Sequence, residues 1–271
     1  MRMIHEANDP IGVFDSGLGG LTVVRQIMKA LPNERVVYFG DTARVPYGTK
    51  SKEAIIRFSK ENVALLLRHR VKMVVVACNT ASSWALEILQ EAYPLPILGV
   101  IVPGACKAAQ VTKNKRVGVI ATQSTVNSQQ YRKNILAFDR RIQVFDQACP
   151  LFVPLAEEGW FNNPVTAQVA AQYLAPLKKA HVDTLILGCT HYPLLKPVIG
   201  KVMGPKVELI DSAEAIVEEI RRLMLAKNLE RRERKVAKHI FLVSDQPAHF
   251  RKLAVRFLGK EITNVKRCQD V

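Results

Sequence analysis

Two cysteines occupy matched positions in two similar stretches of the sequence. Residues 71–80 read VKMVVVACNT and residues 182–191 read VDTLILGCTH, and the two align without a gap so that Cys78 falls on Cys189. Short β-branched apolar runs that stop at polar residues are typical of buried strands. Each cysteine therefore lies where a predicted strand ends, which is the edge at which open α/β sheets bind their ligands.

A pair of thiols on either side of one ligand suits the transfer of a proton from one face of a carbon atom to the other. An ordinary cysteine thiol has a pKa of about 8.5, which falls near a helix N-terminus or a cation, and each of these cysteines precedes a predicted helix. One sulfur can then act as base while the other acts as acid. The alternative role is that of a small buried hydrophobe, which fits Cys106, Cys149 and Cys268.

Small polar and turn-forming residues fall at the same predicted edge, in strand-end loops or in the first turns of helices. They are Ser16, Tyr47, Gly48, Asn79, Thr80, Thr122 and Thr190. Backbone N–H groups at such places point at anions, and a carbanion beside a carboxylate needs donors that are already aimed at it. Singly, each residue is equally well explained as a helix cap. Together they favour a small, polar, anionic ligand.

Three titratable residues are candidates for tuning the thiols by proton exchange or hydrogen bonding. Asp15 ends the first predicted strand, Glu157 lies in an irregular segment, and His191 follows two residues after Cys189. Glu158 comes directly after Glu157, so the sequence leaves open which carboxylate faces the site. Because no further Cys or His lies near His191, we expect no metal site.

Strands and helices alternate along the chain. Strands are expected at 11–16, 35–40, 71–77, 97–100, 116–122, 141–146, 182–188, 207–210 and 240–243, with helices starting near residues 20, 51, 80, 124, 163, 191, 211 and 247. The pattern restarts near residue 116, where Gly118 matches Gly12 at an offset of 106, close to the offset of 111 between the cysteine strands. Such alternation predicts parallel sheets covered by helices.

We therefore expect an α/β fold with two similar domains, each a mostly parallel sheet flanked by helices, and the active site between them. Strand 240–243 and helix 247–258 have no counterpart in the other repeat, so they should pack back on the first unit. This gives residues 1–100 together with 210–271 as the Cys78 domain, and residues 101–209 as the Cys189 domain.

Composition excludes several other classes of protein. The 271 residues are 48% hydrophobic and contain no apolar run approaching the ~18 residues of a membrane span, so we expect a cytoplasmic protein without membrane contact. The net charge is +15. Residues 221–271 hold 14 Lys and Arg against 5 Asp and Glu, which is +9 of that total. Without a nucleic-acid motif we expect nothing beyond nonspecific attraction to nucleic acid.

Five segments resemble the bacterial glutamate racemases of the aspartate/glutamate racemase superfamily, and the resemblance extends from about Ile11 to Ala226. The segments are 15–22 (DSGLGGLT), 40–42 (GDT), 46–48 (PYG), 77–81 (ACNTA) and 187–193 (LGCTHYP). The resemblance implies cofactor-independent interconversion of L- and D-glutamate by two bases, with D-glutamate destined for peptidoglycan. It also implies a cell-wall precursor as a candidate activator, and an exposed active-site edge leads us to expect a homodimer.

Carried over by motif, Cys78 would act on the α-proton of D-glutamate and Cys189 on that of L-glutamate. Asp15 would assist beside Cys78, and Glu157 and His191 beside Cys189. Substrate contacts would fall at Asp15, Ser16, Tyr47, Gly48, Asn79, Thr80, Thr190 and His191, with Thr122 at the same edge.

Three other functional hypotheses are alternatives to glutamate racemisation. A racemase for aspartate or another acidic amino acid would use the same chemistry, because pocket depth sets side-chain length. A dinucleotide-binding protein is disfavoured because Thr22 replaces the third glycine after Gly17 and Gly19. A nucleic-acid-binding protein would depend on the basic C-terminal region, and its binding would have to survive near-physiological salt.

Overall fold

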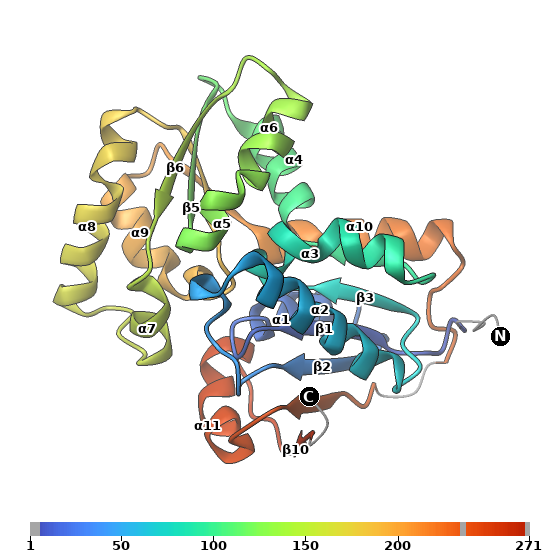
Figure 1. The fold of residues 1–271 in the computed structure, drawn as a ribbon. Coiled ribbons are helices and arrows are strands. Elements are labelled where there is room, and N and C mark those ends of the chain that lie inside the picture. The colour runs from blue at the N-terminus through green and yellow to red at the C-terminus, as the bar shows by residue number, and fades with distance from the viewer. Residues whose placement is uncertain (1–5, 234–236, 269–271) are drawn as a thin grey trace.

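The computed structural model describes residues 6–233 and 237–268, which form two parallel β-sheets covered by helices (Figure 1). The first sheet has the order β10-β9-β2-β1-β3-β4, with β1 Ile11–Asp15, β2 Val36–Gly40, β3 Met73–Val76, β4 Ile97–Gly99, β9 Ile240–Val243 and β10 Val265–Arg267. The second has the order β6-β5-β7-β8, with β5 Arg116–Ala121, β6 Gln143–Ala148, β7 Thr184–Gly188 and β8 Glu208–Asp211.

The two sheets repeat one topology. The order β2-β1-β3-β4 in the first corresponds to β6-β5-β7-β8 in the second, and every pairing is parallel. The two cysteine strands, β3 and β7, occupy the same place in this order. The predicted α/β fold with two similar halves is confirmed, and both cysteines lie at carboxyl ends of strands.

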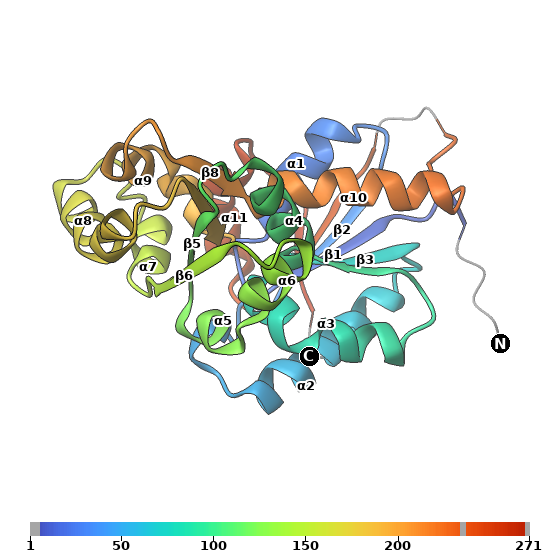
Figure 2. The same ribbon diagram turned by 90° about the horizontal axis from the view of Figure 1, so that it is seen from above.

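Eleven α-helices within the described residues connect the strands. They are α1 Leu21–Ala30, α2 Lys52–Leu67, α3 Asn79–Ala92, α4 Ile101–Val111, α5 Gln123–Ser128, α6 Gln130–Phe138, α7 Phe152–Glu157, α8 Pro164–Lys179, α9 Lys196–Met203, α10 Ser212–Ala226 and α11 Pro247–Leu258. Viewed from above, α1 and α10 cover one side of the first sheet and α2 and α3 the other (Figure 2). Within the described ranges, no helix is long and apolar enough to cross a membrane.

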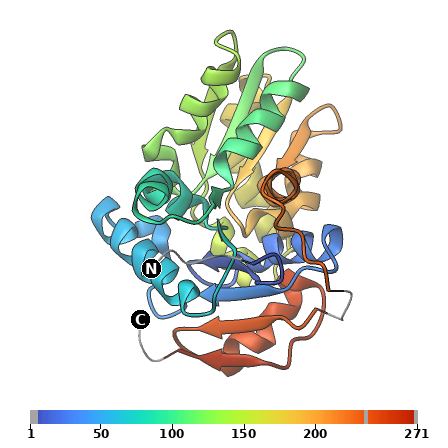
Figure 3. The same ribbon diagram turned by 90° about the vertical axis from the view of Figure 1, so that its right-hand side faces the viewer.

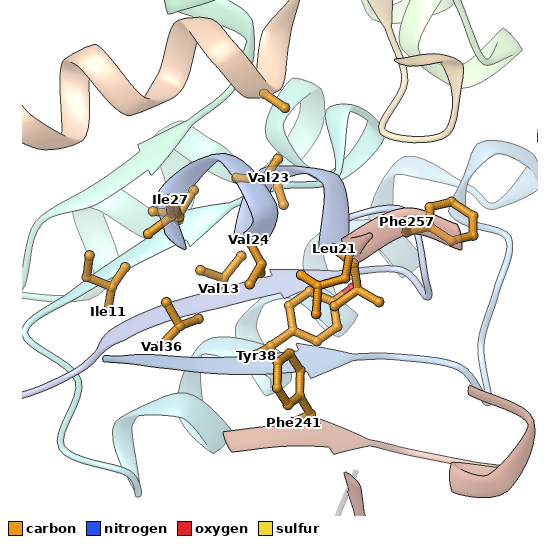
Figure 4. Close-up of a cluster of buried hydrophobic side chains, with 14 of the residues drawn as sticks. Ile11, Val13, Leu21, Val23, Val24, Ile27, Val36, Tyr38, Phe241 and Phe257 are labelled. Carbon is orange, nitrogen blue, oxygen red and sulfur yellow. The ribbon is translucent and has the colours of Figure 1, made fainter. Parts of the chain in front are cut away.

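The C-terminal strand and helix pack on the first sheet, as the absence of a counterpart in the other repeat predicts. β9 pairs with β2, and both C-terminal strands lie at one edge of this sheet (Figure 3). Phe241 of β9 and Phe257 of α11 join a core with Val13, Leu21 and Tyr38 (Figure 4). The domain boundaries stay a prediction, and the one between residues 209 and 210 falls inside β8.

Several elements differ from the sequence-based expectations. Helices α4 and α7 and strand β10 were not expected, and β6 lies at 143–148 rather than 141–146. The helix expected from His191 is a 3-10 turn at Tyr192–Leu195, and α9 begins only at Lys196. Of the basic run 231–235, residues 234 and 235 lie outside the described residues.

A buried ion pair ties the start of β3 to the N-terminal segment and to the connection between α10 and β9. Lys72 Nζ lies 2.5 Å from Glu34 Oε2 and donates to the carbonyls of Ala7 and Leu229 at 2.8 and 2.6 Å. The Arg231 N–H donates to the other Glu34 oxygen at 2.8 Å. Both side chains of the ion pair are almost completely buried, so each charge is stabilised by its partner in place of water.

We expect Lys72→Met to lower the free energy of unfolding by about 3–5 kcal/mol, because it leaves the Glu34 carboxylate buried without its cation. Urea unfolding followed by circular dichroism measures the loss. Adding Glu34→Gln should restore part of the stability, since the amide oxygen can still accept from Arg231 and carries no charge. A Lys72→Met protein as stable as the parent would show that the pair contributes nothing.

Candidate active site

Cys78 and Cys189 line one small cavity between the two sheets. Its volume is about 30 Å³, and it is lined by Ser16, Val45, Pro46, Tyr47, Gly48, Cys78, Asn79, Thr80, Thr122, Val153, Cys189, Thr190 and His191. The first sheet and its loops supply one thiol, and the second sheet supplies the other. A volume of this size holds little more than one water molecule, so the structure corresponds to a closed site.

A larger cavity lies elsewhere, beside the edge strands β4 and β8 and against α4 and α10. Its volume is about 770 Å³. Cys106 lies in its lining rather than in a core, and no other residue singled out from the sequence lines it. Its charged lining residues are Glu208, Asp211, Glu214, Glu218 and Glu219 against Lys107 and Arg222. Because the thiols and polar donors converge on the smaller cavity, that one is the candidate active site.

Cys78 lies at the N-terminus of α3 and is held as a thiol. Its sulfur accepts a hydrogen bond from the Ala81 N–H at 3.5 Å, and its S–H donates to Ser16 Oγ at 3.8 Å. Burial, and then the negative charge of Asp15, raise the pKa of Cys78 to about 12. In the closed site Cys78 therefore carries a proton that it can donate.

Cys189 has a different environment, although its sequence context looks similar. No α-helix begins beside it, because the 3-10 turn separates it from α9. Its sulfur lies instead 3.9 Å from His191 Nδ1, and His191 Nε2 lies 2.9 Å from Glu157 Oε1. Glu158 is exposed, so the carboxylate that faces the site is that of Glu157.

The His191 ring is charged at neutral pH. Burial alone would lower its pKa, but the hydrogen bonds and negative charges of Cys189 and Glu157 outweigh burial and raise it to about 10. The cavity therefore has the Cys78 thiol, which can donate a proton, on one side, and the Cys189 sulfur beside a charged imidazole on the other.

Asp15 lies behind the cavity wall and links the two halves. It is completely buried, accepts from the Gly17 N–H at 3.0 Å, and accepts from Thr190 Oγ1 at 3.4 Å. Burial raises the pKa of Asp15, and the positive charge of His191 opposes that rise. Asp15 and Glu157 are the two predicted site residues that do not line the cavity, and each contacts a residue that does.

Asn79 lines the cavity, and one of its side-chain groups makes no hydrogen bond within the described part of the chain. Its Oδ1 accepts from the Tyr131 hydroxyl at 2.6 Å, while its Nδ2 is buried and has no hydrogen-bond partner among the described residues. A buried donor without a partner is costly, so an anionic group in the cavity would stabilise it. Thr80 and Thr122, both in the cavity lining, hydrogen-bond to each other at 3.0 Å across the two halves.

Tyr47 lines the cavity, but its hydroxyl is engaged elsewhere. It donates to the buried Asp41 carboxylate and accepts from Asn62 Nδ2 at 3.1 Å. Sequence reasoning did not select Val45, Pro46 and Val153, which also line the cavity. Pro46 could have been found from its place next to Tyr47 and Gly48, whereas Val153 carried no signal, since its segment looked irregular.

Within the described residues, no group of three or more His, Cys, Asp or Glu side chains is arranged to hold a metal ion. Cys149 is completely buried in the core around α7 and α8, and Cys268 packs partly buried against another core. Both fit the structural role expected for them.

Comparisons with known proteins agree on one family. A family profile described as Asp/Glu/Hydantoin racemase matches residues 11–220. The glutamate racemase of Geobacter metallireducens is 51% identical over 255 residues, which cover 94% of this chain and 94% of that protein. A glutamate racemase isoform of Bacillus anthracis superposes with a TM-score of 0.94 at 40% identity, covering 97% of this chain and 98% of that one.

Two further solved structures contain ligands. The glutamate racemase of Francisella tularensis, in complex with D-glutamate, has a TM-score of 0.91 at 38% identity and covers 97% of this chain and 98% of its own. The Escherichia coli enzyme, in complex with L-glutamate and the activator UDP-MurNAc-Ala, has a TM-score of 0.79 at 29% identity, with 95% and 97% covered. The chain therefore belongs to the Asp/Glu/hydantoin racemase family and, within it, to the glutamate racemases, which are amino-acid isomerases.

Proposed function

We propose that this chain interconverts L- and D-glutamate by moving the α-proton between Cys189 and Cys78. The observation that carries the proposal is that the two sulfurs line one cavity from two sheets and lie in opposite electrostatic surroundings. The Cys189 thiolate removes the α-proton of L-glutamate and leaves a carbanion. The Cys78 thiol then donates its proton to the opposite face, which yields D-glutamate, a thiol at Cys189 and a thiolate at Cys78.

The enzyme must return a proton from Cys189 to Cys78 before the next turnover in the same direction. His191 and Glu157 offer a proton path on the Cys189 side, since they form a chain of contacts at 3.9 and 2.9 Å. Asp15 is the corresponding carboxyl on the Cys78 side, where burial keeps its pKa raised. For D-glutamate as substrate the roles of the two thiols are reversed.

The substrate carboxylate and the carbanion need donors, and the cavity lining offers them. Asn79 Nδ2 is the buried donor without a partner, and Ser16, Thr80, Thr122 and Thr190 add hydroxyl groups. The backbone at Tyr47 and Gly48 completes the wall. Donors fixed before the reaction stabilise a developing negative charge at little reorganisation cost. The reaction uses thiols and hydrogen bonds, so we propose that it needs no cofactor.

Glutamate enters, in this proposal, when the two halves of the molecule separate. A cavity of about 30 Å³ has no room for a five-carbon diacid, and hydrogen bonds such as Thr80 to Thr122 hold the halves together. The moving bodies would be residues 1–100 with 210–271, and residues 101–209. We further propose that the protein works in the cytoplasm as a homodimer and supplies D-glutamate for peptidoglycan.

A cell-wall precursor remains our proposed activator, by analogy with the Escherichia coli enzyme that was solved with UDP-MurNAc-Ala. The 770 Å³ cavity is unsuited to such an anion, because five carboxylates and only two basic side chains line it. The precursor would therefore have to bind elsewhere. Adding UDP-MurNAc-Ala to the racemisation assay tests the proposal.

Incubation in heavy water tests the proposed reaction directly. With a reductant and without pyridoxal phosphate, we expect the protein to replace the α-hydrogen of glutamate with deuterium while the optical rotation decays to zero. Aspartate, run in parallel, should exchange far more slowly, since it would place its second carboxylate differently. Faster exchange of aspartate would assign the enzyme to the other acidic substrate. A requirement for pyridoxal phosphate would contradict the thiol mechanism.

A further inference from the structure

Helix α11 belongs to the Cys78 half of the molecule but contacts the Cys189 half beside the proposed proton path. It follows β9, which pairs with β2 in the first sheet. Near its end, the Arg256 guanidinium donates to the backbone carbonyl of Glu157, the last residue of α7. The same guanidinium lies against Gly159, where φ is +77° and an added Cβ would lie 3.1 Å from Arg256 Cζ. The C-terminal end of α7 thus rests against this arginine.

The next residue on α11, Phe257, contacts His191, the hydrogen-bond partner of Glu157. Phe257 is completely buried, and its ring meets the His191 ring in a T-shaped arrangement with centroids 5.3 Å apart and planes at 84°. Such packing fixes the plane of an aromatic ring as well as its position. Two consecutive residues of one helix therefore contact both Glu157 and His191, whose own contact is 2.9 Å long.

We propose that Arg256 and Phe257 are positioning residues that align the Glu157–His191 pair with Cys189. Neither lines the cavity that contains the thiols, so both act through the pair. Among the described residues, no hydrogen bond to the Cys78 sulfur comes from the second half, which contacts this side of the site through the 3.4 Å hydrogen bond from Thr190 to Asp15. The Cys78 sulfur is held by Ser16 and Ala81, which belong to its own half. The inference rests on the proposed roles of His191 and Glu157 and adds that α11 sets the rate of proton transfer on the Cys189 face alone.

Loss of these contacts should affect the L-to-D and D-to-L reactions differently, and kinetic isotope effects can measure the difference. The Cys189 step breaks the α-carbon–hydrogen bond of L-glutamate, whereas the Cys78 step breaks that of D-glutamate. If α11 no longer aligns the pair, the Cys189 step becomes slower and limits the rate in both directions. The primary isotope effect on kcat/KM then rises for α-deuterated L-glutamate and falls for α-deuterated D-glutamate. A general loss of folded enzyme would change neither value.

The experiment compares Phe257→Leu and Arg256→Ala with the parent enzyme. Leucine keeps the buried site apolar, so Phe257→Leu remains testable even where a smaller residue would prevent folding. We expect each variant to lower kcat/KM by roughly tenfold or more, as misaligned reacting groups do, with the opposite changes in the two isotope effects. Arg251→Ala, which removes an exposed arginine on the same helix, is the matched control and should leave all values unchanged.

Two outcomes separate this inference from the proposed function. If His191→Asn shows the directional isotope effects while Phe257→Leu and Arg256→Ala match the parent, the α11 inference is wrong and the role of His191 stands. If His191→Asn itself leaves the ratio of the two isotope effects unchanged, the assignment of His191 to the Cys189 step is wrong. Equal changes in both directions for the α11 variants would also overturn the inference, because they would indicate general disruption.

Discussion

Replacing either Cys78 or Cys189 with serine is expected to abolish racemisation while leaving the fold intact. A positioned acid or base contributes about 10²–10⁴-fold to a rate, and a serine hydroxyl ionises far less readily than a thiol. Both residues act in every turnover, so each single variant should lose at least about 10³-fold in kcat/KM. Circular dichroism and polarimetry on the same samples separate loss of chemistry from loss of structure.

The two variants should differ in which enantiomer of glutamate still exchanges its α-hydrogen with solvent. Cys78→Ser keeps the base for L-glutamate, so we expect slow exchange of its α-hydrogen with heavy water and no exchange with D-glutamate. Cys189→Ser should show the reverse preference. Cys106→Ser is the control, since that thiol lies in the larger cavity away from the site. A single variant at either position that racemises glutamate at the parent rate would remove that cysteine from the mechanism.

The strand-end positions of the thiols could be predicted because they depend on local sequence. An apolar β-branched run that stops at a polar residue specifies both the strand and its end, and the repeat shows that β3 and β7 are equivalent. Helices α4 and α7 were missed for a common reason. Each has a proline as its third residue, Pro103 and Pro154. A first-turn proline lacks only an N–H that has no partner within the helix, so these prolines do not interrupt the helices.

The difference between the two thiols could not be predicted from local sequence, because it depends on tertiary contacts; only the resemblance to the glutamate racemases implied Asp15 beside Cys78, and Glu157 and His191 beside Cys189. Both cysteines precede small polar residues, yet only Cys78 caps an α-helix. The charge beside Cys189 comes from a histidine whose partner, Glu157, lies 34 residues away in the sequence. The contact with α11 spans 99 residues, from Glu157 to Arg256. Neither hydrophobic periodicity nor a short local motif shows that residues so far apart in the sequence are in contact in the fold.

A second large loss of kcat/KM is expected from Gly19→Ala, which adds one methyl group. This glycine lies in the turn between β1 and α1, and a Cβ there would lie 2.1 Å from Thr190 Oγ1 and 2.5 Å from His191 Nδ1. Both distances are far below van der Waals contact. Thr190 and His191, which the added Cβ would overlap, belong to the other half of the molecule. The overlap is therefore relieved either by a shift of His191 or by separation of the two halves. Either change misaligns Cys189.

We expect Gly19→Ala to lower kcat/KM by about 10²-fold, because a displacement near 1 Å at a reacting group costs that much. If the halves separate, small-angle scattering should show a larger radius of gyration that D-glutamate only partly reverses. Gly200→Ala in α9 is the matched control, since a Cβ there meets only Leu209 at 3.5 Å, an ordinary contact. A Gly19→Ala enzyme with parental kcat/KM would mean that catalysis does not require the close approach of the β1–α1 turn to His191. The closed arrangement would then not be the one in which the proton moves.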